Sequence, residues 1–258
     1  MGHGQSTERA TALERQQFAI AQHSTATFWH RVRFSLVAAE VRRAGAVTVV
    51  DIGAGSGGLG LWCRRHLRNT TYRWAEVSPT LAAGLRTTFG DEAELVLGDR
   101  VGPGVVIAML DVLEHIEDDE AALRTLADSM AHDTVLVLTV PAGPGLFSSW
   151  DTSLGHFRRY TRRSLREVVD AAGLRVVRCD YLFPELLPLA ARRVVGDRRR
   201  ATRGERPTTG GTADFPDLPR WVDAIAHVVA RSSAACRRLW PCGTSLVAVV
   251  VPGAGGGR

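Results

Sequence analysis

The sequence predicts one α/β domain built on a doubly wound, mostly parallel β-sheet. Short apolar runs alternate along the chain with segments of helical periodicity, which is the pattern of successive strand–helix units. The runs at 105–110 and 134–140 are apolar on both faces, as in parallel strands that helices cover from both sides. With 258 residues, 45% of them hydrophobic, the chain can bury one sizeable core without disulfides or a metal.

The individual elements follow from this periodicity and from the turn residues between the runs. Strands are expected at 47–53, 71–77, 93–97, 104–110, 134–140, 174–183 and 244–251. Helices are expected at 8–22, 28–44, 58–67, 79–88, 118–131 and 219–239, with a further helix between Thr161 and Gly173.

We interpret residues 1–258 as a single domain. Its parts are an N-terminal helical lid at 1–46, the core at 47–183, a helical insertion at 184–240, and the last strand and tail at 241–258. Residues 196–217 contain no aliphatic core residue and are rich in Arg, Gly, Thr and Pro, so we expect a mobile loop there, within the insertion; it overlaps the arginine-rich stretch at 191–206.

Composition and charge argue against several classes of protein. The chain has 32 basic residues, all of them arginine, and 27 acidic ones. Residues 191–206 carry the whole net charge, which argues against a nucleic-acid-binding domain. No run approaches the ~20 apolar residues of a membrane helix, and residues 1–20 lack the apolar region of a signal peptide. The four cysteines form no C-x-x-C pair, so we expect reduced thiols, a cytoplasmic location and no metal site.

The strongest chemical signal is the glycine-rich turn VVDIGAGSGG at 49–58, between a buried strand and a helix. Gly53, Gly55 and Gly57 let backbone amides at the helix start approach a cofactor closely. The turn also satisfies G-x-G-x-x-G, so a nicotinamide-dependent oxidoreductase is an alternative. In both interpretations Glu76, at the end of the next strand, would bind ribose hydroxyls.

Three further carboxylates distinguish the two interpretations. Asp51 lies two positions before the first glycine, Asp99 ends the third expected strand, and Asp111 ends the fourth. Several carboxylates suit a zwitterionic, methionine-like tail with a positive sulfonium better than they suit two phosphates.

These motifs, in this order and spacing, resemble the class I S-adenosylmethionine-dependent methyltransferases: VVDIGAGSG, Glu76 in AEVSP, GDR at 98–100 and DVLEHI at 111–116. The resemblance spans about 47–183 plus the last strand. It implies a Rossmann-like fold of seven strands with the last one antiparallel, and S-adenosylmethionine as cofactor with S-adenosylhomocysteine as product. The cofactor-binding residues that it implies are Asp51, Gly53, Gly55, Gly57, Glu76, Asp99, Arg100 and Asp111. Segments 28–34, 140–161 and 241–249 resemble a narrower bacterial branch that acts mostly on small molecules.

The acceptor site is expected in the 141–161 loop, which leaves the carboxyl end of the fifth strand, where open α/β sheets bind their ligands. His156 and Asp151 are the catalytic candidates, because a histidine can take a proton near neutral pH. His156 can equally be a structural brace, and Glu114 and His115 can be helix caps. The residues expected to contact the acceptor are Trp29, Phe147, Trp150, Arg159 and Tyr160.

The sequence therefore predicts methyl transfer to a small organic acceptor, with no nucleic-acid partner and at most weak peripheral membrane contact. A lipid-linked or quinone-like acceptor is an alternative, because apolar residues stand beside arginines in LFPELLPLAARRVV at 182–195. A nicotinamide-dependent oxidoreductase and a non-catalytic cofactor-binding protein are the alternatives from other classes.

Overall fold

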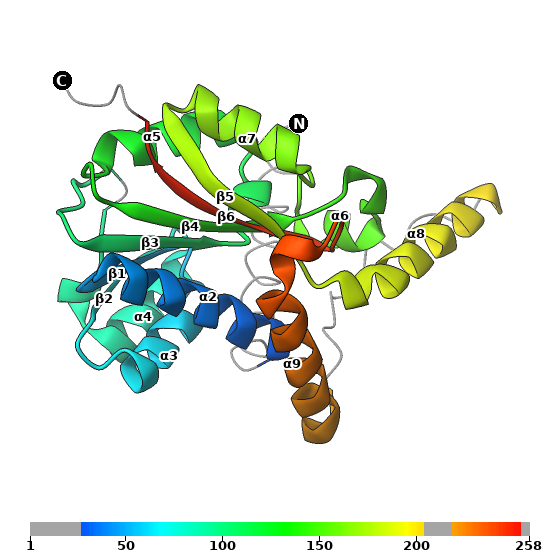
Figure 1. Ribbon diagram of the computed structural model, residues 1–258, viewed down its shortest axis with the longest axis horizontal. Coiled ribbons are helices and arrows are strands. Elements are labelled where there is room, and N and C mark those ends of the chain that lie inside the picture. The colour runs from blue at the N-terminus through cyan, green and yellow to red at the C-terminus, as the bar shows by residue number, and fades with distance from the viewer. Residues whose placement is uncertain (1–26, 97, 204–217, 254–258) are drawn as a thin grey trace, which may run out of the picture.

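The computed structural model describes residues 27–96, 98–203 and 218–253 (Figure 1). A six-stranded sheet has the order β2-β1-β3-β4-β6-β5. The strands are β1 (Thr48–Ile52), β2 (Thr71–Ala75), β3 (Val105–Leu110), β4 (Val135–Pro141), β5 (Leu174–Leu182) and β6 (Ser245–Pro252). Strands β1 to β4 pair in parallel, and β6 is antiparallel to both β4 and β5. The doubly wound sheet and its antiparallel last strand are thus confirmed.

The prediction of seven strands is wrong, because the segment expected at 93–97 does not form a strand. It begins as a 3₁₀ turn, Asp91–Ala93, and then makes a single parallel bridge between Glu94 and Trp74. The Arg86 guanidinium holds the Glu94 carboxylate with two contacts of 2.6 Å from the preceding helix. Among the described residues the sheet therefore ends at β2.

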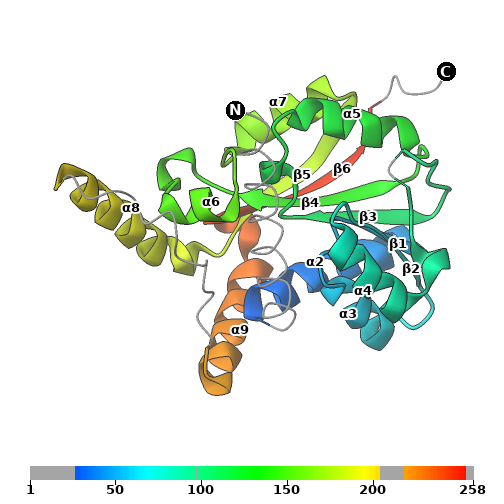
Figure 2. The same cartoon turned by 180° about the vertical axis from the view of Figure 1, so that it is seen from behind.

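Helices cover both faces of the sheet (Figures 1 and 2). On one face lie α5 (Asp119–Ser129) and α7 (Arg162–Ala171), and on the other α2 (Phe28–Ala44), α3 (Gly58–His66) and α9 (Arg220–Ala235). Helix α4 (Pro79–Phe89) packs beside β2, and α6 (Ser149–Leu154) lies in the loop after β4. The helix expected at 8–22 lies outside the described residues.

Alternation along the strands produces the two cores. Val49, Val106 and Val137 face the α2 side, whereas Val50, Ile107 and Leu138 face the α5 side. Successive strand side chains point to opposite faces, so strands that are apolar at every position bury both. No helix of the described residues is long and apolar enough to cross a membrane.

The prediction of a mobile loop at 196–217, which overlaps the arginine-rich stretch at 191–206, is wrong for residues 196–202, because α8 (Leu187–Thr202) continues through them. Residues 204–217 lie outside the described residues. Pro188 stands in the first turn of this helix, where its missing N–H costs nothing, and arginine and alanine favour helix. Helix α8 projects from the body of the molecule (Figure 1). Past the middle of α8, Asp197 accepts hydrogen bonds from the backbone N–H and hydroxyl of Ser149, at 2.7 and 2.9 Å.

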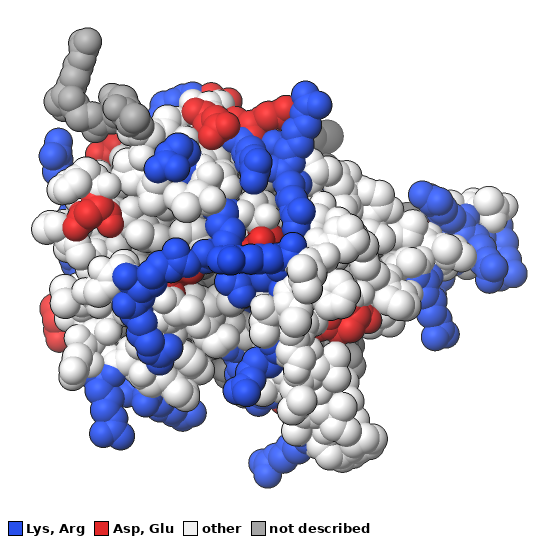
Figure 3. All heavy atoms as spheres, in the orientation of Figure 1, with Lys and Arg blue, Asp and Glu red and all other residues white. Residues whose placement is uncertain are grey.

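Arginines are not confined to this helix. Figure 3 shows a band of basic side chains across the face seen in Figure 1, and a second group at the free end of α8. Some arginines have carboxylate partners: Arg178 pairs with Glu40 and Asp180, and Arg237 pairs with Asp180.

Candidate active site

The candidate site lies at the carboxyl ends of β1, β3 and β4. The turn at 53–57 follows β1, the segment 111–115 follows β3, and the 142–160 loop follows β4. Because these strands are parallel neighbours, the three segments meet at one edge of the sheet. The residues predicted for cofactor and acceptor are therefore brought to the same end of the molecule.

The glycine turn has a backbone that only glycine adopts without strain. Gly53, Gly55 and Gly57 have φ angles of 70°, 58° and 79°. A Cβ atom on Gly53 would lie 2.6 Å from the Val112 side chain, and one on Gly57 would lie 2.6 Å from the Phe89 ring. A Cβ atom on Gly55 would meet nothing within 4 Å. Side chains thus pack closely against the turn at Gly53 and Gly57, whereas the space beside Gly55 is open.

Glu76 follows β2 and holds the open part of this turn. One carboxylate oxygen accepts a hydrogen bond from the Gly55 N–H at 2.9 Å, and the other accepts one from the Ser78 N–H at 2.8 Å. A carboxylate has about four lone-pair directions, so two remain for a ligand. Glu76 can therefore hold the turn in place and bind a ligand beside it at the same time.

Asp51 lies beneath the turn. It is 4% exposed and accepts a hydrogen bond from the Tyr72 hydroxyl at 2.8 Å. Burial raises the pKa of Asp51 to about 7, and the Glu76 charge adds to this effect, although the Tyr72 hydrogen bond opposes it. Its placement supports a role in shaping the turn.

Asp99 and Arg100 lie in the turn that follows the Glu94–Trp74 bridge. Both are exposed and follow Gly98, whose φ of 99° turns the chain after the single bridge of this segment. The Asp99 backbone N–H donates to the Val96 carbonyl at 3.1 Å, which fixes the backbone of this turn.

Asp111 has a strained backbone and two partners. Its φ of 56° is in the left-handed region, which costs a residue other than glycine roughly 1–3 kcal/mol. The Thr139 hydroxyl donates to Oδ1 at 3.0 Å, and the Arg33 guanidinium contacts Oδ2 at 2.9 Å. Arg33 is itself buried and also donates to the Ser245 hydroxyl at 3.2 Å. Helix α2 is thus tied to the carboxyl end of β3.

The loop after β4 is organised around Asp151, which is fully buried. Its carboxylate accepts hydrogen bonds from the Ser148 N–H at 2.9 Å and the Arg159 Nε at 2.7 Å, and it contacts His156 Nδ1 at 3.0 Å. Burial alone would raise the pKa of Asp151, but the hydrogen bonds from His156 and Arg159 hold it below its ordinary value. Arg159 also donates to the Ala142 carbonyl at 3.1 Å.

His156 brings this loop against the segment after β3. Its Nε2 lies 3.9 Å from Oε1 of Glu114, and its ring lies edge-on to His115 with centroids 4.7 Å apart. Burial, with the Asp111 charge, raises the pKa of Glu114 well above its ordinary range. Burial, with the neighbouring His156, lowers the pKa of His115 to about 4. Sequence reasoning treated Glu114 and His115 as possible caps and did not pair them with His156.

The predicted aromatic contacts lie on two elements. Trp29 is half-buried on α2, with its ring 4.9 Å from that of Phe28. Phe147 is exposed, and the Arg193 guanidinium of α8 lies 4.0 Å from the centroid of the Trp150 ring. Trp150 therefore packs against α8 and forms part of the contact between the loop and the insertion.

Tyr160 is placed in the core. Its hydroxyl donates to Asp119 at 2.7 Å, and Arg158 pairs with the other oxygen of that carboxylate at 2.9 Å. Its ring belongs to the apolar core on the α5 side. This arrangement braces the end of the loop against α5.

His30 is a residue that sequence reasoning missed. It lies on α2, where Nδ1 is 2.6 Å from the Thr27 hydroxyl. Burial and the positive charge of Arg33 lower its pKa to about 4, while Asp111 acts in the opposite direction. The signal in the sequence was its position three residues before Arg33, which places both on one helix face.

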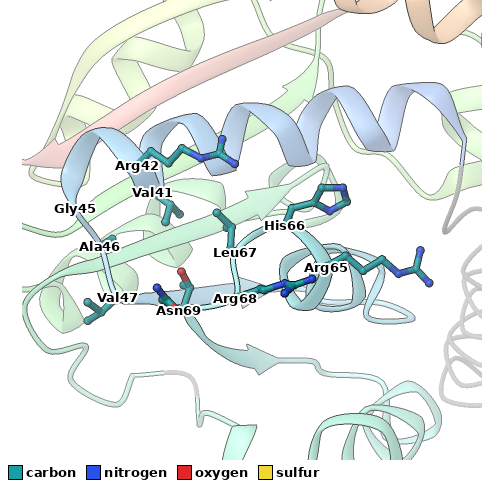
Figure 4. Close-up of a pocket in the computed structure, with 11 residues that line it drawn as sticks. Val41, Arg42, Gly45, Ala46, Val47, Arg65, His66, Leu67, Arg68 and Asn69 are labelled. Atoms are coloured by element: carbon teal, nitrogen blue, oxygen red, sulfur yellow. The ribbon is translucent and has the colours of Figure 1, made fainter.

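A pocket of about 540 Å³ lies elsewhere, between the end of α2 and the connection from α3 to β2 (Figure 4). Arg42, Arg65, His66 and Arg68 line it, with no carboxylate among its lining residues. It borders the amino ends of β1 and β2, so it is separate from the candidate active site.

Comparison with known proteins identifies the family. Residues 22–178 match the family model described as a methyltransferase domain. The chain matches no curated protein. A solved protein from Galdieria sulphuraria, provisionally assigned as a sarcosine dimethylglycine methyltransferase, is 12% identical, with a TM-score of 0.53 over 85% of this chain and 84% of that one. The [4+2]-cyclase SpnF is 16% identical, with a TM-score of 0.50 over 86% of this chain and 80% of that one.

The two structural similarities concern the fold, and the family match goes further because it covers more than half of the chain. It decides between the two cofactor interpretations of the glycine turn and confirms the family, enzyme class and cofactor predicted from the sequence. The chain belongs to the methyltransferase domain family and is an S-adenosylmethionine-dependent methyltransferase.

Proposed function

We propose that the protein methylates a small organic acceptor, of the kind that bacterial metabolism supplies. The observation that carries this proposal is the convergence at one sheet edge of the glycine turn, the Glu76 and Asp111 carboxylates, and the polar loop around Asp151. Such an edge is where open α/β sheets bind ligands. The small acceptor and the bacterial source rest on the sequence resemblance.

The residues around the turn fit the cofactor. Gly55 offers open space at the turn, and Glu76 keeps two lone-pair directions for ribose hydroxyls. We assign Asp99 and Arg100 to the adenine end, Asp111 to the amino group, and Asp51 to support from below, with Gly53 and Gly57 shaping the turn. In this arrangement the Asp111 carboxylate would lie at the positively charged end of the ligand, where it is electrostatically favourable.

When bound, the cofactor supplies an electrophilic methyl group on a positive sulfonium. The protein's own task is to align the acceptor with that methyl group and to exclude water. Asp151 is a positioning residue, because its oxygens are occupied by Ser148, His156 and Arg159. His156 is the residue of this loop that we place beside the reacting atoms.

We propose that the acceptor binds between α2 and the 141–161 loop. Trp29 from α2 and Phe147 from the loop would supply apolar walls, and Arg159 would supply a polar group. Trp150 would set the wall through its contact with Arg193, and Tyr160 would brace the loop through Asp119. Helix α2 and this loop would together form the lid, and residues 1–26 of the lid expected at 1–46 lie outside the described residues. A pocket of few polar groups among apolar walls suits a small molecule.

A lipid-linked or quinone-like acceptor is the second candidate. Exposed apolar side chains lie on α8 and α9, where Leu189 is 53% exposed and Trp221 is 69% exposed. Arginines accompany them on α8, so this surface would complement an acceptor molecule that carries both an apolar tail and an anionic group.

The test is calorimetry of the full-length protein with S-adenosylhomocysteine, followed by mass spectrometry of reactions with S-adenosylmethionine and candidate acceptors. We expect S-adenosylhomocysteine to bind and NADH not to bind, and a small hydroxylated or amine acceptor to gain one methyl group. Binding without any methylated product across both acceptor classes would leave a cofactor-binding protein and would contradict the proposal.

A further inference from the structure

Three side chains that commonly bind metals converge between β3 and the 142–160 loop: the Glu114 carboxylate and the imidazoles of His115 and His156. One donor atom from each lies within 4.8 Å of the others. The Glu114 Oε1 to His156 Nε2 distance is 3.9 Å. Donor atoms that bind one ion at about 2.0–2.2 Å lie roughly 3–4 Å apart. Small side-chain rotations would therefore bring all three to ligand distance.

Donor atoms of Glu114 and His115 in this cluster are buried without hydrogen-bond partners among the described residues. Glu114 is 1% exposed, and among the described residues neither of its carboxylate oxygens has a hydrogen-bond partner. Nδ1 of His115 is also buried without a hydrogen-bond partner among these residues. Buried polar atoms without partners are costly. A single proton can bridge only two such atoms, whereas one cation can satisfy them all.

The surroundings orient both histidines as a metal site requires. Nδ1 of His156 contacts the Asp151 carboxylate at 3.0 Å, which turns Nε2 towards Glu114. The backbone of Gly155 hydrogen-bonds the ring of His115. Histidines that bind metals characteristically give their second ring nitrogen to a carboxylate or a backbone carbonyl.

We propose that Glu114, His115 and His156 bind one divalent first-row transition-metal ion. Two imidazoles and one carboxylate suit zinc and its neighbours in that row. Three protein ligands leave coordination positions free for water or another ligand, as in catalytic sites. This proposal departs from the expectation of no metal, which considered cysteine spacing and not ligands from two separate loops.

A role for this ion in methyl transfer rests on the proposed function. A hydroxyl bound to a divalent ion loses its proton more readily, so the ion would select acceptors that carry a metal-binding hydroxyl. The hydroxyl proton would pass to solvent, the oxygen would form the bond to the methyl carbon, and the carbon–sulfur bond would break to leave S-adenosylhomocysteine. His156 would then be a ligand and not the base.

The test uses full-length, tag-free protein stripped of metal with a chelator and titrated with Zn²⁺ by calorimetry. We expect one ion per chain. Glu114→Gln and His156→Gln should each weaken Zn²⁺ binding at least tenfold, whereas the matched exposed controls Glu117→Gln and His132→Gln should leave it unchanged. Substitution with Co²⁺ should give an absorption spectrum without a thiolate charge-transfer band, which excludes the cysteines as ligands.

Absence of Zn²⁺ binding to the wild-type protein, or a thiolate band with Co²⁺, would overturn the metal site. Equal affinity in the cluster variants and their controls would also overturn it. A parallel titration with S-adenosylhomocysteine shows whether each variant is folded. It also separates the two proposals. Zn²⁺ binding without S-adenosylhomocysteine binding would contradict only the proposed function, whereas S-adenosylhomocysteine binding without Zn²⁺ binding would contradict only the metal site.

Discussion

Replacing Glu76 by Gln tests whether this residue joins the cofactor to the glycine turn. The carboxylate accepts hydrogen bonds from the Gly55 and Ser78 N–H groups at 2.9 and 2.8 Å. An amide can keep only one oxygen acceptor, so its NH₂ group would face one of these donors. Each hydrogen bond to a charged group contributes about 1.5–3 kcal/mol. Because one of the two hydrogen bonds is lost, we expect the free energy of unfolding of the cofactor-free protein to fall by about that amount.

For a chain of this length such a loss lowers the melting temperature by roughly 3–10 °C, which differential scanning calorimetry resolves. The loss of a ribose contact should in addition weaken the binding of S-adenosylhomocysteine at least tenfold, as measured by isothermal titration calorimetry. Glu92→Gln is a suitable control, because Glu92 is an exposed carboxylate in the nearby 3₁₀ turn. A lower melting temperature with unchanged cofactor affinity would refute the ribose role and leave Glu76 as a brace of the turn.

Three further predictions follow from the same geometry. Gly53→Ala should destabilise the protein by about 1–3 kcal/mol, because its Cβ would clash with Val112 at a φ of 70°. Gly55→Ala, at a φ of 58° but with open space around its Cβ, carries the backbone strain alone, so it should lower the melting temperature less than Gly53→Ala while it weakens S-adenosylhomocysteine binding. Asp51→Asn should gain stability relative to wild type as pH rises from about 4 to about 7, and the difference should level off above pH 7. The folded-state pKa of about 7 lies above the ordinary 3.8, so wild type loses up to about 4 kcal/mol over this range, and a pH-independent difference in denaturant titrations would contradict that pKa. Asp223→Ala should lower thermal stability by the equivalent of about 1–2 kcal/mol, because it removes the acceptor at the start of α2, and an unchanged melting temperature would show that this contact contributes nothing.

The sheet was predictable where strands are buried on both faces, and less so at its edge. The runs that became β3 and β4 are apolar at nearly every position, with Thr139 as the polar exception, and this pattern is typical of strands that helices cover on both faces. The run at 93–97 is also mostly apolar, apart from Glu94, but a segment at the edge of the sheet has at most one neighbouring strand. The pairing of Glu94 with Arg86 and the 3₁₀ turn at Asp91–Ala93 leave it a single bridge, and neither is readable from periodicity.

The candidate site divides in the same way between local and long-range features. The glycine turn was predictable because its conformation is encoded by the glycines themselves. The cluster of Glu114, His115 and His156 was not, because it depends on the fold of the 142–160 loop around Asp151. The arginine-rich composition of α8 likewise suggested a loop, although the helix is docked through Asp197.

Helix α2 connects parts of the molecule that are remote in sequence. At its first residue, Phe28, the backbone N–H donates to the Asp223 carboxylate of α9 at 2.8 Å, and Arg31 pairs with the same carboxylate at 2.6 Å. Less than one turn further along, Arg33 contacts Asp111 at the carboxyl end of β3 and lies over the Phe183 ring at the entrance to the insertion. A displacement of α9 would therefore reach Asp111 through a single rigid helix. If the insertion selects the acceptor, this path lets acceptor binding alter the residue that we assign to the amino group of the cofactor, without any direct contact between the two ligands.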